Sequence, residues 1–173
     1  MMKTLEVLFI DQLADLSDAE DRTAQALPRL IKAAACPKLE ELLRQHLAEA
    51  RGHLARLEQI FKSLGEDNGG KTCHSTIGLL KEIDEIIADF KGSPSLNAAI
   101  ILAAQKIAHY KIASYGCLLE WARLLNHEAS AELLEDILHQ EKSADEALTA
   151  LARSGKNQEA CALPVFVAEQ EPS

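Results

Sequence analysis

The sequence has few of the residues that favour β-strands. Aromatic residues make up only 4% of the 173 residues, and no stretch keeps an alternation of apolar and polar residues. Strands are enriched in aromatic and β-branched residues and usually show that alternation, so a β-rich fold is excluded. Apolar residues instead recur at three- and four-residue spacing along most of the chain, which predicts an all-α fold.

An excess of basic charge and a long apolar run are also lacking. The 18 Lys and Arg residues stand against 27 Asp and Glu residues, and the formal net charge is −9. Such a chain repels phosphate backbones, so we expect no nucleic-acid partner. The longest stretch without charge, 92–105, is too short to span a bilayer, and the N-terminus shows no secretory signal pattern. We therefore expect no membrane partner and a cytoplasmic location.

The four cysteines are scattered singly and lack the spacing of a disulfide framework or a CxxC pair. They are Cys36, Cys73, Cys117 and Cys161. This usage is typical of a reducing compartment, and we predict four free thiols.

The apolar spacing predicts four long helices and one short one. The long helices cover about 4–35, 37–65, 96–125 and 128–154, and the short helix covers about 76–91. Pro28 should kink the first helix, because it removes one backbone donor. Pro37 and Gly65 suit the two ends of the second helix. Asn126 is a candidate N-cap of the fourth long helix, and Gly155 is a candidate stop.

The connections between these helices are unequal in length. Short connections make the first and second long helices, and likewise the third and fourth, antiparallel neighbours. About 30 residues separate the second from the third, which is enough for a crossover along the bundle. We therefore predict a ferritin-like antiparallel four-helix bundle over residues 1–155, with the short helix in the crossover. The tail, 156–173, has no clear period, and its apolar segment 163–167 covers either the bundle or a dimer seam.

Three of the long helices carry a single charged residue in an otherwise apolar seam. These residues are Glu20, Lys111 and Glu141. Buried carboxylates are costly unless they are neutralised, so their convergence implies a metal ion, shared protons or a cation among them. Carboxylates and imidazoles contributed by all four helices are the way in which bundles hold di-iron or di-manganese sites.

The second long helix is ambiguous. One of its lines is purely apolar, and the adjoining line holds His46, Glu49 and His53. The two histidines are either ligands or boundary residues of a wide apolar stripe. Both interpretations remain open from the sequence.

Simpler interpretations exist for other residues. Ser17 and Glu20 have the spacing of a capping box that would start a separate helix. Lys111 has a side chain long enough to carry its ammonium to the edge of the bundle. The remaining histidines are surface or supporting residues and the large aromatic residues are core residues; they are His74, His109, His127, His139, Tyr110, Tyr115 and Trp121.

Short motifs recur over nearly the whole chain up to about Leu151. They are Asp11-Gln12-Leu13-Ala14-Asp15-Leu16 leading to Ala19-Glu20; His46-Leu47-Ala48-Glu49 through His53 to Arg56-Leu57-Glu58; Ala103-Ala104-Gln105; His109-Tyr110; Ile112-Ala113; Tyr115-Gly116; Glu141-Lys142; and Ala144-Asp145. Together they resemble the YciE/YciF family of bacterial stress-associated ferritin-like proteins.

The resemblance implies a homodimer of four-helix bundles with a candidate di-metal centre between the helices. The residues of this chain that stand where its ligands are expected are Glu20, Glu49, His53, Glu141 and Asp145. The pairs Glu49/His53 and Glu141/Asp145 are four residues apart, which departs from the Glu-x-x-His spacing of ferritins.

A second departure lies on the third long helix. Relatives show Glu-His-Tyr-Glu there, whereas this chain has Ala108-His109-Tyr110-Lys111. The site is thereby about three charges more positive, which offsets roughly one and a half divalent ions. Our hypothesis is that Lys111 replaces a lost metal and pairs with Glu20, Glu49 and Glu141. The expected cofactor is then none, or one divalent metal ion, iron or manganese, held by Glu49, His53, Glu141 or Asp145.

Three functions follow as alternatives. The first is a non-enzymatic, stress-associated bundle protein with a degenerate di-metal site. The second is an active di-iron or di-manganese oxidoreductase or peroxide-scavenging protein. The third is iron storage in a cage, against which the crossover helix and tail argue. The sequence leans away from an enzyme and identifies no small-molecule substrate.

Overall fold

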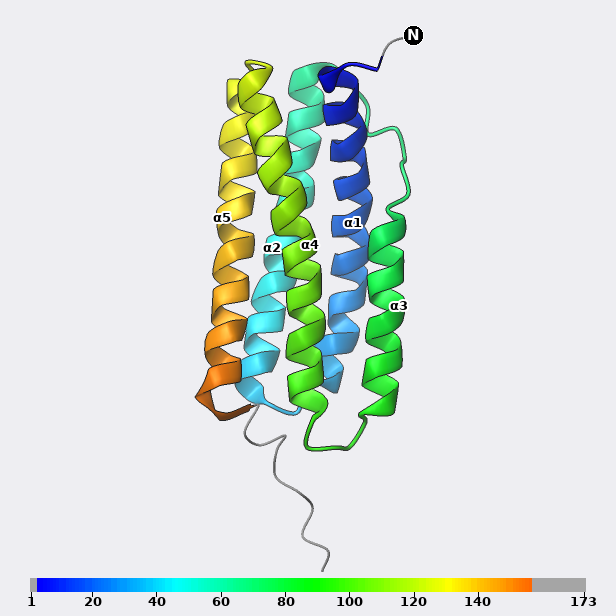
Figure 1. Ribbon diagram of the computed structural model, residues 1–173, viewed down its shortest axis with the longest axis vertical. Coiled ribbons are helices and arrows are strands. Elements are labelled where there is room, and N and C mark those ends of the chain that lie inside the picture. The colour runs from blue at the N-terminus through cyan, green and yellow to red at the C-terminus, as the bar shows by residue number, and fades with distance from the viewer. Residues whose placement is uncertain (1–2, 157–173) are drawn as a thin grey trace, which may run out of the picture.

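The computed structural model describes residues 3–156, and within them it contains helices and no strand (Figure 1). The helices are α1 (Leu5–Ala33), α2 (Pro37–Leu64), α3 (His74–Asp89), α4 (Leu96–Leu124) and α5 (Glu128–Leu151), followed by a short π-helical turn, Ala152–Lys156. The all-α prediction is confirmed. The predictions for Cys161 and for the tail beyond residue 156 lie outside the described residues.

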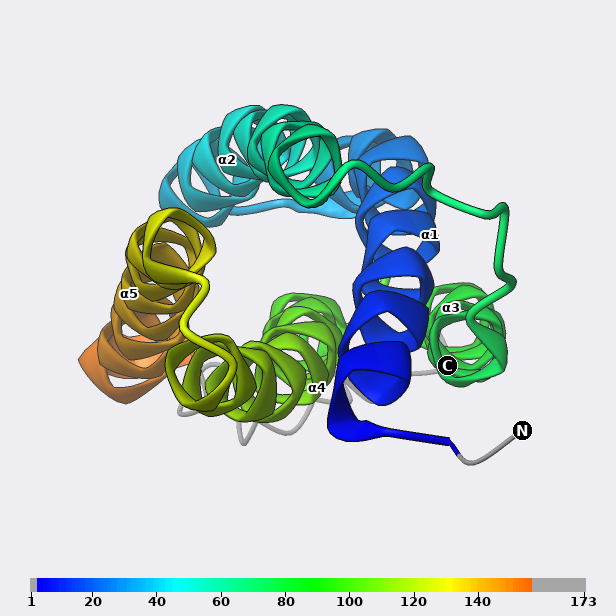
Figure 2. The same ribbon diagram turned by 90° about the horizontal axis from the view of Figure 1, so that it is seen from above.

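Helices α1, α2, α5 and α4 form a ring around the core, and α3 lies outside it against α1 and α4 (Figure 2). The two short connections join the antiparallel pairs α1–α2 and α4–α5, as predicted. The chain leaves α2 at one end of the bundle and returns along α3 to the other end, where α4 starts (Figure 1). This long crossover makes the fold the ferritin-like bundle that the sequence predicts.

Most of the predicted helix ends agree with the structure, but Asn126 does not cap α5. The N-cap of α5 is His127, while Asn126 has a φ of 61°. The Asn126 N–H donates to the Arg123 carbonyl (3.2 Å), and the His127 N–H donates to the Ala122 carbonyl (2.9 Å). These two bonds form a Schellman motif that closes α4. Asparagine tolerates the left-handed conformation that this tight reversal needs, so it serves the preceding helix.

The sequence alternatives for α1 are also resolved. The helix is continuous from Leu5 to Ala33, with Pro28 inside it. Ser17 therefore lies within a helix and caps none. Its hydroxyl accepts a hydrogen bond from the Asn68 amide (2.8 Å) in the crossover loop. The capping-box interpretation of Ser17 and Glu20 is wrong, and Glu20 belongs to the core-facing side of a single long helix.

The core consists of two apolar layers, one towards each end of the bundle. The first packs the N-terminal half of α1 against the far ends of α2, α4 and the start of α5, and includes Phe9, Leu13, Leu16, Leu57, Leu118 and Leu134. The second packs the opposite ends and includes Leu30, Leu39, Leu43, Ile83, Ile100 and Leu148. Between these apolar layers the ring encloses polar side chains. None of the helices within residues 3–156 combines the length and apolar character needed to cross a membrane.

Candidate functional site

Five ionisable side chains from all four ring helices meet between the two apolar layers. They are Glu20 of α1, His46 and His53 of α2, Lys111 of α4 and Glu141 of α5, and none is more than 2% exposed. We call this group the charged layer. Its members occupy seam positions of their helices, so the same spacing that buries the leucines also turns these side chains inward.

Lys111 lies at the centre of the charged layer. Its Nζ is 2.5 Å from Glu141 Oε1, 3.1 Å from Glu20 Oε2 and 3.2 Å from His46 Nε2. A lysine ammonium has three N–H donors and no acceptor, so these contacts use all of its hydrogen-bonding capacity. The side chain is completely buried, and the alternative in which Lys111 reaches out to the bundle edge is wrong.

His53 faces hydrogen-bond acceptors on both of its ring nitrogens. Nδ1 is 3.0 Å from Glu20 Oε1 and 3.3 Å from Glu141 Oε1, and Nε2 is 2.9 Å from Gln140 Oε1. The Gln140 oxygen also accepts from Arg56 at 3.0 Å, and since arginine can only donate, this contact fixes the amide orientation. Both nitrogens of His53 therefore carry protons, and the ring is an imidazolium.

The pKa values agree with this assignment. Burial lowers the pKa of His53, but hydrogen bonds to Glu141 and Glu20 outweigh burial and raise it to about 9. Burial also opposes ionisation of both carboxyl groups, yet the nearby Lys111 charge holds their pKa values below the usual range. The carboxylates in turn raise the pKa of Lys111 against the effect of its burial. Two negative and two positive groups thus balance in the charged layer.

Tyr115 supports the charged layer from the next turn of α4. Its hydroxyl donates to Glu20 Oε1 at 2.8 Å, and its ring meets His53 edge-on at a centroid distance of 6.3 Å. Burial, followed by the charge of Glu20, raises the pKa of Tyr115 well above its ordinary value, so the hydroxyl remains a donor. The sequence interpretation of Tyr115 as a core residue is right about burial but missed this contact. The sequence holds a signal for this contact, because Tyr115 lies four residues after Lys111 and therefore on the same face of α4.

Glu49 lies outside the charged layer. It is half-buried, and its Oε1 accepts from the Gln45 amide at 2.8 Å. His46 and His53 are seven residues apart and share one face of α2, whereas Glu49 is displaced around the helix from both. Lys111 therefore pairs with Glu20 and Glu141, but not with Glu49 as the hypothesis also expected.

Asp145 also lies apart from the charged layer, between α4 and α5. Its Oδ1 accepts from the Gln105 amide at 3.1 Å and is 3.3 Å from His109 Nε2. The His109 side chain is 66% exposed and that of Asp145 is 17% exposed, so the pair is reached by solvent from the His109 side. Metal binding by Glu49 or Asp145 stays a prediction.

Glu20, His53 and Glu141 each offer a ligand atom within 4.8 Å of the other two, and such a group can hold a metal ion. These ligand atoms already have partners, because Lys111 donates to both carboxylates and His53 is protonated towards them. Two other buried atoms of the charged layer, His46 Nδ1 and Glu141 Oε2, have no hydrogen-bond partner. Gln140 and Arg56, which orient His53, lie beside the apolar seams. Gln140 carried no sequence signal, and Arg56 belongs to a motif of the family resemblance that did not indicate this role.

The thiols within residues 3–156 match the prediction for free cysteines. Cys36 and Cys73 are buried, Cys117 is exposed, and all three are free. Cys73 Sγ lies 3.0 Å from the Tyr110 hydroxyl, which donates to Asp15 at 2.8 Å. Burial raises the pKa of Tyr110, and these contacts tie the crossover to α1 and α4.

Comparisons with known proteins agree with the fold and with the resemblance. Residues 4–161 match the family described as domain of unknown function DUF892. Protein YciF of Escherichia coli K12 is 38% identical over 162 residues, which cover 92% of this chain and 96% of that protein. The crystal structure of the E. coli stress protein YciF superimposes with a TM-score of 0.86 and 37% identity, covering 91% of this chain and 99% of that one.

A second solved structure, YcfI of Rhodopseudomonas palustris, has a TM-score of 0.82 and 38% identity, covering 84% of this chain and 93% of that one. These similarities extend over nearly the full length of the described helices. The chain belongs to the DUF892 family and is homologous to E. coli YciF.

Proposed function

We propose that this protein is a stress-associated ferritin-like bundle protein in which an internal ion-pair layer has replaced a di-metal centre. The association with stress rests on its homologue, which is described as the E. coli stress protein YciF. The replacement rests on Lys111, whose ammonium uses its three donors on Glu20, Glu141 and His46. In this proposal Lys111 stands where a metal-binding carboxylate stands in relatives.

Charge balance and ligand count both support this proposal. The charged layer is neutral without any ion, because Lys111 and His53 offset the two carboxylates. Di-iron and di-manganese bundles use a carboxylate from each of two helices and a Glu-x-x-His pair from each of the other two. Here two carboxylates converge with a lysine, and Glu49 and Asp145 bind elsewhere. We therefore expect no metal, or at most one divalent ion per chain.

Metal analysis tests the proposal directly. The purified protein is incubated with Fe²⁺ or Mn²⁺, desalted and analysed by mass spectrometry for metal per chain. We expect no more than one equivalent. Two equivalents of either metal per chain would contradict the proposal.

A charge-restoring variant sharpens this test. Lys111→Glu combined with Ala108→Glu returns two carboxylates to buried positions of α4 and should increase metal uptake. The matched control is Lys106→Glu with Ala113→Glu, which makes the same charge change at less buried positions of the same helix. Mn²⁺ should raise the melting temperature of the first variant and leave that of the control unchanged.

An active di-metal oxidoreductase or peroxide-scavenging protein is the second candidate. It is favoured by the convergence of Glu20, His53 and Glu141 within 4.8 Å. Bound metal together with a peroxide-dependent absorbance change would establish it over the first proposal. We also expect a homodimer, and a native mass measurement distinguishes this state from a storage cage of many subunits.

A further inference from the structure

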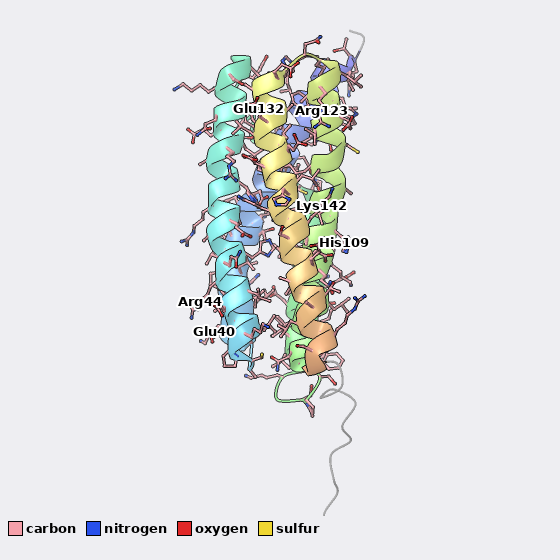
Figure 3. All side chains as sticks on the ribbon, turned by 90° about the vertical axis from the view of Figure 1, so that its left-hand side faces the viewer. Glu40, Arg44, His109, Arg123, Glu132 and Lys142 are labelled. Carbon is pink, nitrogen blue, oxygen red and sulfur yellow. The ribbon has the colours of Figure 1, made fainter. Side chains whose placement is uncertain are left out.

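A small cavity lies between α2 and α5, on the face that Figure 3 presents. Its volume is about 50 Å³. The polar and small residues that line it are Gln45, His46 and Glu49 from α2 and Ser143, Ala144 and Ala147 from α5. The two alanines leave the space open, because a larger side chain at either position would extend towards α2. His46 belongs both to this cavity and to the charged layer.

We propose that this cavity binds one small neutral solute with an O–H group, water or hydrogen peroxide, and that His46 links this solute to Lys111. The Nε2 atom of His46 lies 3.2 Å from the Lys111 ammonium and 3.6 Å from Glu141 Oε2. The shorter contact is with a group that only donates, so we assign Nε2 as its acceptor. The ring proton of His46 is therefore on Nδ1. That N–H is buried and has no protein partner.

An unpaired buried donor costs about 1 to 3 kcal/mol, and such groups usually bind an ordered water molecule. The cavity next to His46 has room for at least one molecule of that size. Because Nδ1 has almost no solvent-accessible surface, a solute in the cavity can pair with it only if the solute carries an acceptor atom and the imidazole moves towards the cavity. The occupant must therefore carry a hydrogen-bond acceptor.

Glu49 indicates that the occupant is also a hydrogen-bond donor and not an anion. Its carboxylate lines the cavity, so it repels anions and can accept a proton donor. A cation offers no acceptor atom to the Nδ1–H of His46, so it would leave that donor unpaired, and the charged layer beneath it is neutral. An uncharged molecule that both accepts and donates satisfies His46 and Glu49 together. Water and hydrogen peroxide share this chemistry and are small enough for the cavity.

The inference shares the Lys111–His46 contact with the proposed function, but it does not require that a metal centre has been replaced. If it is correct, solvent communicates with a completely buried ammonium through Glu49, the solute and His46. The charged layer would then have one defined hydrogen-bonded connection to the α2–α5 surface. Failure of this inference would leave the metal-replacement proposal untouched, since no metal measurement bears on the cavity.

A crystal structure of the wild-type protein at high resolution tests the proposal. We expect one solvent peak in hydrogen-bond distance of both His46 Nδ1 and the Glu49 carboxylate. Ala147→Leu should fill the cavity and remove the peak, whereas Ala113→Leu, at an exposed position of α4, should retain it. Ala144→Leu serves as the second filling variant if Ala147→Leu does not fold. A wild-type cavity without density would overturn the proposal, as would a peak that persists in a filled variant.

Hydrogen peroxide distinguishes the two occupants. Its addition to protein labelled with ¹³C and ¹⁵N in histidine should give a saturable shift of the His46 ring resonances if peroxide enters the cavity. The shift should disappear in Ala147→Leu and remain in Ala113→Leu. Without a shift, a solvent peak in the crystal assigns water as the occupant. A shift of equal size in Ala147→Leu would place peroxide elsewhere and count against the cavity as its site.

Discussion

The apolar layers and the charged layer of this bundle are built by the same four helices but hold together in different ways. In the apolar layers each side chain stabilises the fold through its own burial, and one apolar residue can replace another of similar volume at small cost. In the charged layer each group depends on a particular partner, such as Lys111 on Glu20 and Glu141. The apolar layers therefore spread their contribution to stability over many residues, whereas the contribution of the charged layer depends on complete pairing.

This distinction has an energetic basis. Moving charges out of water costs several kcal/mol per ion, and close pairing in the interior approximately repays that cost. Removing one member leaves its partner buried and unpaired, which is strongly destabilising, whereas removing all members together is often neutral. The following predictions test whether the charged layer behaves in this all-or-none manner, in order of decreasing expected effect.

Lys111→Met should produce the largest loss. It leaves the Glu20 and Glu141 carboxylates facing each other with His53 as their remaining cation. We expect the free energy of unfolding to fall by about 3 to 5 kcal/mol, measured by urea denaturation at neutral pH. Lys106→Met is the matched control on the same helix, where the lysine pairs with Glu82 and is more than one-third exposed. Its effect should stay below about 1 kcal/mol.

A loss for Lys111→Met no greater than that of the control would show that the two carboxylates share a proton or bind another cation. Metal analysis of the variant separates these two cases, since a bound cation would appear as about one equivalent per chain. Either result would show that the charged layer does not depend on complete pairing, and the contrast with the apolar layers would then be wrong.

Alkaline pH should weaken the charged layer through His53. Its pKa rises from 6.5 in the unfolded chain to about 9 in the fold, so its contribution is complete below pH 6.5 and is lost as pH rises through 9. The difference corresponds to about 3 kcal/mol. Urea denaturation at pH 6, 7.5 and 9.5 should show a decline in the free energy of unfolding in that window.

His53→Gln should remove this decline, because glutamine does not titrate. His109→Gln should retain it, since His109 is largely exposed on α4. An identical pH profile in wild type and His53→Gln would assign the decline to other groups. At the acid end the sign reverses, because Glu20 and Glu141 have lowered pKa values and their contribution is lost below their ordinary range.

Replacing the charged layer as a whole should have the smallest effect. Glu20→Met, Lys111→Met and Glu141→Met are combined in one variant with His46→Leu, His53→Leu and Tyr115→Phe, because these three residues would otherwise lose their buried partners. The middle of the bundle then becomes a third apolar layer. We expect a free energy of unfolding within about 1 kcal/mol of the wild type, or higher, from urea denaturation. A loss greater than that of Lys111→Met alone would show that the charged layer is a net source of stability.

The sequence predicts the helices and the crossover, and it places Glu20, Lys111 and Glu141 in apolar seams that should face the core. For Glu20 and Lys111 it also allows a capping box and an ammonium at the bundle edge, and only the structure decides against these alternatives. The sequence does not predict the rotation of α2. Two candidate lines lie side by side there, and the structure buries part of each, including Leu39, Leu43, His46, His53 and Ile60. The rotation of α2 about its own axis is set by its packing against α1 and α5, and no pattern within the α2 sequence indicates it.

The positions of two ligands inferred from the family resemblance could not be predicted from the sequence either. Glu49 and Asp145 each lie on the helix that carries a member of the charged layer, at three or four residues from it. At 3.6 residues per turn, a spacing of three or four residues leaves an offset of about 40 to 60° around the helix axis, which is enough to change a carboxylate from fully buried to partly exposed. The contacts of His53 with Gln140, and of Gln140 with Arg56, need two helices in register, so they emerge only from the assembled bundle.

The placement of α3 gives the bundle walls of unequal thickness. On the α1–α4 flank a second shell of protein stands between solvent and the interior, while on the α2–α5 flank a single pair of helices does so (Figure 2). A molecule that docked across α2 and α5 would cover the thinner wall, and with it the cavity that opens between these two helices.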